Sequence, residues 1–182
     1  MLSWWSADRA KRRKAQEIYG AVVAQARHPR FYACHGIPDT PEGRYEMIVL
    51  HLFLVLEHLR RAGSAHEELS RMLIETFVTD MDDAMRELGV GDLTVPRKVK
   101  AAAAGFYSRS GAYRTALDTL DTRAPLAAIV EAMTGSAPLP DRAGLERYLR
   151  SAFTALQGIP AGAVGQAPPA FPEVPVCSPE PR

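Results

Sequence analysis

The chain has 182 residues, with 22 lysines and arginines against 21 aspartates and glutamates, so its formal net charge is only +1. This length suits one domain with a sizeable hydrophobic core, and the balanced charge gives no general case for binding nucleic acid. The two cysteines, Cys34 and Cys177, are far apart in the sequence, so they imply no disulfide framework and fit a reducing compartment.

The N-terminal segment is basic, because residues 1–30 hold seven lysines and arginines against two acids. Apolar residues recur there at spacings of three and four, which predicts a helix over 7–27. Indoles favour the headgroup zone of a membrane and anionic lipid attracts cations, so a membrane-surface contact is one hypothesis. RNA attachment and a merely solvated helix face remain alternatives. The residues concerned are Trp4, Trp5, Lys11, Arg12, Arg13 and Lys14.

Residues 47–56 are apolar at nine of ten positions, and the tenth is His51. A span across a bilayer needs about 20 apolar residues, and charged residues flank this run on both sides. A helix that is apolar all round must then be buried inside the protein. We therefore predict a central helix over 41–61, begun by Asp39 or Thr40 and ended at Gly63. His51 should be a hydrogen-bonded core histidine, with Asp80 one candidate partner.

The rest of the chain predicts further helices and then a tail. Helical spacing continues over 64–88, 96–122, 124–134 and 141–157, and no stretch alternates with the period of a strand. Seven of the fourteen prolines lie between residues 158 and 182, which predicts a disordered or extended tail there. The predicted fold is all-α: one domain, 1–157, built as a bundle of about six helices around 41–61.

Charges of opposite sign gather on the third and fourth predicted helices. Asp80 continues the apolar stripe of its helix and should point inward or toward a cleft, where a charge needs a partner. Residues 93–117 hold five basic residues and no acid, and the short loop before them makes the two helices antiparallel neighbours. The charges then form either internal salt bridges or a polar binding groove. Its predicted contacts are Asp80, Asp82, Asp83, Arg97, Lys98, Lys100, Tyr107 and Arg109, with ordinary helix packing as the alternative for Tyr107.

Enzymatic chemistry has little support in the sequence. No Gly-x-Ser-x-Gly elbow or phosphate-binding glycine loop occurs, and neither cysteine lies in a catalytic setting. The Glu-x-x-His and His-x-x-x-His spacings of metal-binding bundles are absent as well. We therefore predict a non-enzymatic protein without a metal or other cofactor. A haem-handling or metal enzyme that uses His51 or His58 is a weaker alternative.

Several stretches in the first two thirds of the chain occur in an order that resembles the ubiquinol–cytochrome c chaperone family. The resemblance covers roughly residues 31–122, and the ordered set is more specific than any single piece. The N-terminal helix and residues 124–157 match more loosely, and the tail beyond 158 shows no resemblance. The stretches are 36–40 (GIPDT), 43–44 (GR), the apolar run through His51, 80–82 (DMD), 86–93 (RELGVGDL), 95–100 (VPRKVK), and Phe106-Tyr107 with Arg109.

The resemblance implies an assembly factor that binds newly made cytochrome b and promotes assembly of the ubiquinol–cytochrome c reductase complex. It further implies work at the cytoplasmic face of the membrane, with peripheral membrane contact and with a ribosome or a small protein as candidate partners. DNA is not an expected partner. The alternative from the charges alone is a helical nucleic-acid-binding regulator that uses the basic N-terminus and the fourth helix.

Overall fold

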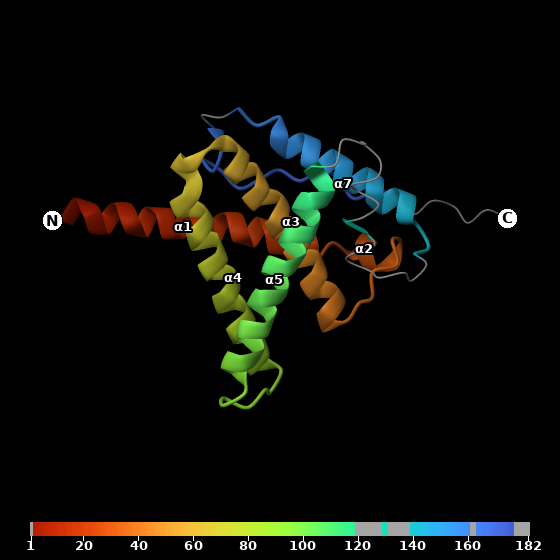
Figure 1. The fold of residues 1–182 in the computed structure, drawn as a ribbon, viewed down its shortest axis with the longest axis horizontal. Coiled ribbons are helices and arrows are strands. Elements are labelled where there is room, and N and C mark those ends of the chain that lie inside the picture. The colour runs from red at the N-terminus through yellow and green to blue at the C-terminus, as the bar shows by residue number, and fades with distance from the viewer. Residues whose placement is uncertain (1, 119–128, 131–138, 161–162, 177–182) are drawn as a thin grey trace.

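The structure is a computed structural model that describes residues 2–118, 129–130, 139–160 and 163–176. All regular elements in these residues are helical, which confirms the predicted all-α class (Figure 1). The predicted helix at 124–134 falls almost entirely outside the described residues. The elements are α1 (Leu2–Ala26), α2 (Pro29–Ala33), α3 (Pro41–Ala62), the short 3-10 helix η1 (Ser64–His66), α4 (Glu67–Glu87), α5 (Val95–Asp118) and α7 (Arg142–Gln157).

Helix α3 is the buried centre of the fold, as its sequence predicts. The Thr40 hydroxyl caps its first turn by accepting a hydrogen bond from the Gly43 backbone N–H at 3.2 Å, and Gly63, with φ of 109°, ends it. Every residue from Met47 to Val55 is buried. No helix in the described part of the chain is long and apolar enough to cross a membrane.

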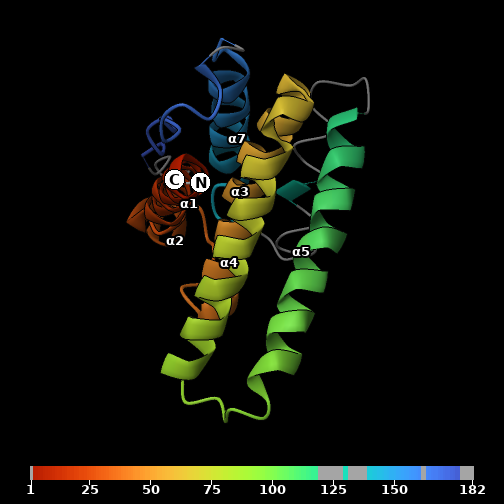
Figure 2. The ribbon, with the colours of Figure 1, turned by 90° about the vertical axis from the view of Figure 1, so that its left-hand side faces the viewer.

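Helices α4 and α5 form an antiparallel hairpin whose turn projects away from the other helices (Figure 2). The hairpin packs on α3, and α1 crosses α4 on another side (Figure 1). The two hairpin helices stay close near the turn and diverge toward the opposite end, where α3 lies between them. The hairpin therefore gives α3 two neighbours and leaves surfaces between the three helices.

Of the two forms predicted for the tail over 158–182, disordered or extended, the described part is extended and docked. In its described part, residues 163–176 lie against the helices, and the side chains of Val164 and Val174 belong to the buried core. The Arg30 guanidinium donates a hydrogen bond to the Val174 carbonyl at 2.7 Å. Prolines rule out a helix here, but they also favour an extended backbone that loses little entropy on docking. Buried valines supply the apolar contact.

His51 is a fully buried core histidine, and the residues that contact it differ from the prediction. Its Nδ1 lies 2.7 Å from the Met47 carbonyl, which can only accept, so Nδ1 carries the proton. The Tyr148 hydroxyl then donates to Nε2 at 2.6 Å. Gln25 donates to the Tyr148 hydroxyl at 3.0 Å and to the Pro172 carbonyl at 3.2 Å. One chain of hydrogen bonds thus joins α1, α3, α7 and the C-terminal segment.

The segment between α1 and α3 differs from the prediction in two places. The His28 side chain caps the short helix α2 by accepting from the Arg30 backbone N–H at 3.3 Å, where the sequence indicated only the end of a helix. Cys34, which follows α2, is disulfide-bonded, and its partner lies outside the described residues. The sequence indicated no disulfide framework and a reducing compartment, and the bonded state of Cys34 corrects the first of these expectations.

Candidate functional site

A large groove lies between the first half of α3, the second half of α4 and the first half of α5. Its volume is about 990 Å³, which is at the upper end for small-ligand sites and can take several side chains of a polypeptide. We call it the hairpin groove. Its lining residues are Arg27, Asp39–Glu42, Arg44–Glu46, Ile48, Asp80, Met81, Ala84, Met85, Glu87, Leu88, Val90, Lys98, Ala101, Ala102, Gly105 and Arg109.

The floor of the hairpin groove is apolar and built from flexible or very small side chains. Met81 and Met85 come from α4, and Ala101 and Ala102 face them from α5. Methionine has an unbranched, polarisable side chain that adapts to irregular apolar partners, and it is common on promiscuous binding surfaces. Alanines let a bound segment approach the α5 backbone closely. Sequence reasoning missed this floor, although the run of small residues after Lys100 was its visible signal.

An ion pair and an aromatic ring join α5 to α3 at one edge of the hairpin groove. Arg109 pairs with Glu46 and lies over the Tyr45 ring, with its guanidinium carbon 5.7 Å from the ring centre. The Tyr45 hydroxyl donates to the Ala102 carbonyl at 2.7 Å. Burial raises the pKa of the Glu46 carboxyl, and the Arg109 guanidinium opposes that rise. Arg109 is thus part of the wall that shapes the groove.

Gly105 permits the close approach of α5 to this edge. A Cβ at this position would lie 3.1 Å from both the Tyr45 hydroxyl and an Arg109 guanidinium nitrogen. Gly111, two turns later on the same helix, has nothing within 4 Å of the corresponding point. The glycine at 105 therefore serves the contact between α5 and α3, whereas the one at 111 has no such packing role.

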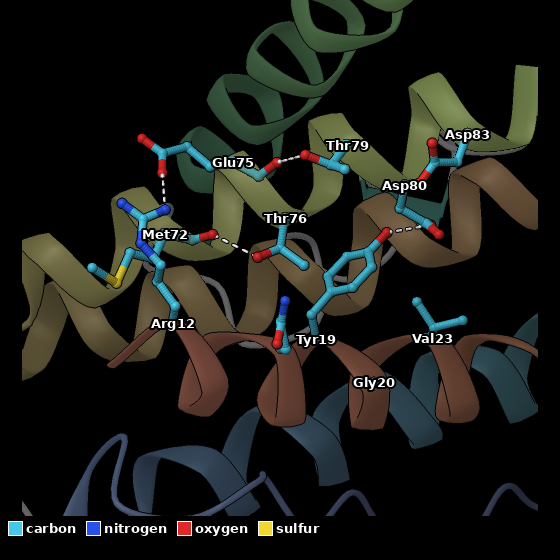
Figure 3. A pocket seen from close by; sticks show the side chains of 11 residues that line it. Arg12, Tyr19, Gly20, Val23, Met72, Glu75, Thr76, Thr79, Asp80 and Asp83 are labelled. Carbon is cyan, nitrogen blue, oxygen red and sulfur yellow. Dashed lines mark hydrogen bonds and ion pairs between the residues drawn. The ribbon is translucent and has the colours of Figure 1, made fainter. Parts of the chain in front are cut away.

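Asp80 lies where the hairpin groove meets a smaller polar pocket between α1 and α4 (Figure 3). The Tyr19 hydroxyl donates to an Asp80 carboxylate oxygen at 2.7 Å, and this bond ties α1 to α4. Burial, reinforced by this carboxylate, raises the pKa of Tyr19. Asp80 was a candidate partner of His51, and that prediction is wrong. Asp83 lines the same polar pocket.

The structure brings together only part of the predicted contact set. Asp80, Lys98 and Arg109 line the hairpin groove. Asp82 instead pairs with Arg86 on the exposed side of α4, at 2.6 Å. The others lie elsewhere on the molecule: Asp83 in the α1–α4 pocket, Tyr107 in a second cleft, and Arg97 and Lys100 exposed on α5 outside the groove.

The alternative of salt bridges between the third and fourth predicted helices is not what the structure shows. In the part of the chain that the structure describes, no ion pair joins α4 to α5. The α5 arginines reach back to α3 instead, Arg109 to Glu46 and Arg114 to Glu57. Several acids of α4 instead pair within their own helix or with α1, as Asp82 does with Arg86 and Glu68 with Lys11. The first cations of α5 face solvent or the groove.

Tyr107 borders a cleft at the other end of the hairpin, where α4 and α5 diverge. This cleft has a volume of about 720 Å³ and an apolar lining that includes Phe53, Ile74 and Phe106. Tyr107 is 59% exposed and packs edge-on against Phe106, with ring centres 5.5 Å apart. The ring thus packs on its own helix and presents a face to solvent, and a contact with a partner at Tyr107 stays a prediction.

The basic residues of the N-terminal helix are engaged within the fold. Lys11 pairs with Glu68, Arg12 with Asp8 at 2.9 Å, and Arg13 with Glu17 at 3.2 Å. Lys14 donates to Gln166 at 3.1 Å. The side chains of Trp4 and Trp5 lie outside the described part of the structure. Exposed pairs of this kind are weak, so these cations stay available to other partners.

Histidine ligation has no support in the geometry. Both ring nitrogens of His51 are used inside the core. The Nε2 atom of the buried His58 has no hydrogen-bond partner. Among the described residues, no three side chains of the metal-binding types gather into a possible site.

Comparison with known proteins decides the family. The sequence profile of the family described as ubiquinol-cytochrome C chaperone matches residues 34–171. The chain belongs to the ubiquinol–cytochrome c chaperone family. The match extends beyond the predicted range of 31–122. It includes α7, which lies within the range 124–157 of looser resemblance, and it reaches residue 171 of the C-terminal segment, for which the sequence showed no resemblance.

A solved structure agrees with this assignment. The crystal structure of the Cbp3 homolog from Brucella abortus superposes with a TM-score of 0.80 at 34% sequence identity. The alignment covers 96% of this chain and 98% of that one. No curated protein matches the chain. Membership of the ubiquinol–cytochrome c chaperone family supports a chaperone role in assembly of a complex and a non-enzymatic one.

Proposed function

We propose that this protein binds newly made cytochrome b in the hairpin groove and promotes assembly of the ubiquinol–cytochrome c reductase complex. The observation that carries the proposal is a groove with an apolar, methionine-containing floor and a charged rim in a member of a chaperone family. A membrane protein that has not yet been inserted presents apolar helices, and such helices need cover from water.

The groove suits an apolar or amphipathic helix as its occupant. One face of such a helix would lie on Ile48, Met81, Met85 and the α5 alanines, in the helix-in-groove mode. Lys98 has no ion-pair partner in the described structure, and it lies at the rim beside this floor. A rim cation can bind the carbonyl end of a client helix or an acidic residue in an adjoining loop.

The same proposal places the protein at the cytoplasmic face of the membrane, in peripheral contact with it. A ribosome or a small protein partner would deliver or share the client there. The second cleft, next to Tyr107, is one described surface that remains open for such a partner when the hairpin groove is filled.

The rim cation provides a test with little risk to folding. Lys98→Glu should lower the amount of cytochrome b recovered with the tagged protein from mildly solubilised membranes by about tenfold, because it reverses a charge at the groove without breaking an internal contact. Arg150→Glu is the matched control, since Arg150 is exposed on α7 and lies outside both the groove and the start of α5. Equal recovery of cytochrome b with a folded Lys98→Glu variant and with wild type would argue against a role for the rim.

A further inference from the structure

The turn of the α4–α5 hairpin holds the most exposed large apolar side chain of the described structure. Leu93 is 99% exposed and Leu88 is 67% exposed, whereas Val95, two residues after Leu93, is completely buried. The turn projects beyond the remaining helices (Figure 2). We call residues 88–94 the hairpin tip.

The hairpin tip is an ordered turn that holds its leucines outward. Gly89 has φ of 74° and ends α4, and the Val90 N–H donates to the Met85 carbonyl at 3.1 Å. The Gly91 carbonyl accepts from the N–H groups of Thr94 and Val95 at 2.7 and 3.2 Å. The backbone hydrogen bonds of the turn are thus made within the turn and with the adjoining ends of α4 and α5. None of them covers the Leu93 side chain.

Three cations without partners adjoin the hairpin tip at the start of α5. Arg97, Lys98 and Lys100 form no side-chain hydrogen bond or ion pair with the described part of the chain. They also stand where the positive end of the helix dipole disfavours cations, and the first turn contains no acid to offset them. The acids nearby are Glu87 and Asp92, and Asp92 pairs with Arg86. Stability of the helix therefore does not explain this placement.

We propose that the hairpin tip docks on the surface of an anionic lipid bilayer. Leu88 and Leu93 would enter the boundary between headgroups and acyl chains, and the three α5 cations would lie against the lipid phosphates. Exposed apolar side chains beside cations are the combination that holds peripheral proteins to such membranes. RNA offers phosphates to the same cations, but it gives Leu93 no apolar environment.

Docking of this kind sets the orientation of the hairpin groove. The groove lining includes two residues of the hairpin tip, Leu88 and Val90, and one of the three α5 cations, Lys98. With the tip in the headgroup layer, one end of the groove opens at the bilayer surface. This places the groove where a membrane helix leaves or enters the lipid, although the docking itself does not depend on what the groove holds.

The test measures binding of the full chain to lipid vesicles without any client. Wild type should co-sediment with mixed phosphatidylglycerol–phosphatidylcholine vesicles and much less with pure phosphatidylcholine vesicles. Leu88→Ser/Leu93→Ser should weaken the anionic binding by about tenfold or more, and Arg97→Glu/Lys100→Glu should abolish its dependence on salt. Val176→Ser is the matched control, because Val176 is 67% exposed and lies away from the hairpin tip.

A fluorescent residue at the tip separates this contact from one made by α1. In the variant Trp4→Phe/Trp5→Phe/Leu93→Trp, the single indole should shift its emission to the blue on anionic vesicles. An unshifted indole on vesicle-bound protein would overturn the proposal. So would vesicle binding that survives the leucine changes but is lost in Lys11→Glu/Lys14→Glu, or salt-dependent binding to RNA without binding to vesicles. Each of these results leaves the cytochrome b proposal intact.

Discussion

Replacing His51 with leucine is expected to make the protein less sensitive to acid. Between pH 6.5 and pH 4 the unfolding free energy of wild type should fall by about 3 kcal/mol more than that of the variant. Burial lowers the pKa of His51 from 6.5 to about 4, although its bond to the Met47 carbonyl opposes the shift. The folded protein therefore holds this imidazole neutral at pH values where the unfolded chain has protonated it. One pKa unit corresponds to about 1.4 kcal/mol, so the shift is a substantial linkage term.

The sign follows from which state binds the proton. Because the folded pKa is the lower one, this contribution is fully present above pH 6.5 and is lost as the pH falls toward 4. The leucine variant should be less stable than wild type by about 1–3 kcal/mol at pH 7, since the Tyr148 hydroxyl loses its acceptor. Its unfolding free energy should then fall less steeply in acid, as measured by denaturant titration at several pH values.

Tyr148→Phe is the matched control for the His51 result. It removes the hydroxyl that donates to Nε2 but keeps the buried imidazole. The control should therefore lose stability at pH 7 and retain the steep dependence on pH. Equal slopes for wild type and His51→Leu would show that burial of this histidine is not the source of the acid sensitivity.

A phenylalanine at position 101 should lower the affinity for cytochrome b segments by at least about tenfold, which is about 1.4 kcal/mol. Ala101 is exposed and lies on the α5 side of the hairpin groove, so the larger ring would fill space that a client helix needs. Surface substitutions of this kind usually change stability by less than about 0.5 kcal/mol. Fluorescence anisotropy with labelled peptides that tile cytochrome b would measure the loss.

Ala104→Phe provides the comparison for Ala101→Phe. Ala104 is equally exposed on α5 but does not line the hairpin groove, so the same change there should leave the affinity within about twofold of wild type. A loss of affinity in both variants would point to a general effect of the added ring. A loss in the Ala104 variant alone would move the binding surface from the hairpin groove to a neighbouring face of α5.

The buried central helix was predictable because its burial follows from its own sequence and does not depend on which helices pack against it. A helix that is apolar on every side and too short to span a bilayer must lie in the protein core. Met47–Val55 are buried as expected. The partners of His51 were not predictable. Helical spacing fixes the face on which a residue lies, but the register between helices depends on the whole packing, which brings Tyr148 to His51 and Tyr19 to Asp80.

The charged residues of the site show the same limit. The sequence predicted acids on α4 and cations on the neighbouring helix α5. It did not determine whether these side chains form ion pairs with one another. The α5 arginines reach α3, because Glu46 and Glu57 on that helix need partners as they become buried. The groove floor was missed for a different reason. Alanine and methionine carry no chemistry that marks a site, and only the folded hairpin shows that Met85 and Ala101 line one surface.

The C-terminal segment illustrates the limits of composition as a guide. Proline content disfavours helices and strands, and it leaves open whether the segment is disordered or extended on a surface. Whether such a segment is ordered depends on whether its apolar side chains can be buried against the rest of the fold. Val174 is buried, and Arg30 donates a hydrogen bond to its carbonyl. The pattern of valines among the prolines was the available signal, although it does not reveal where on the helices the segment docks.

Site-specific photo-crosslinking tests the central claim most directly. A photoreactive amino acid placed at Met85, on the floor of the hairpin groove, should form an adduct with newly made cytochrome b in cells. The same probe at Ala104, outside the groove, should form none. Adducts from position 104 without any from position 85 would contradict the proposal that this groove holds the client.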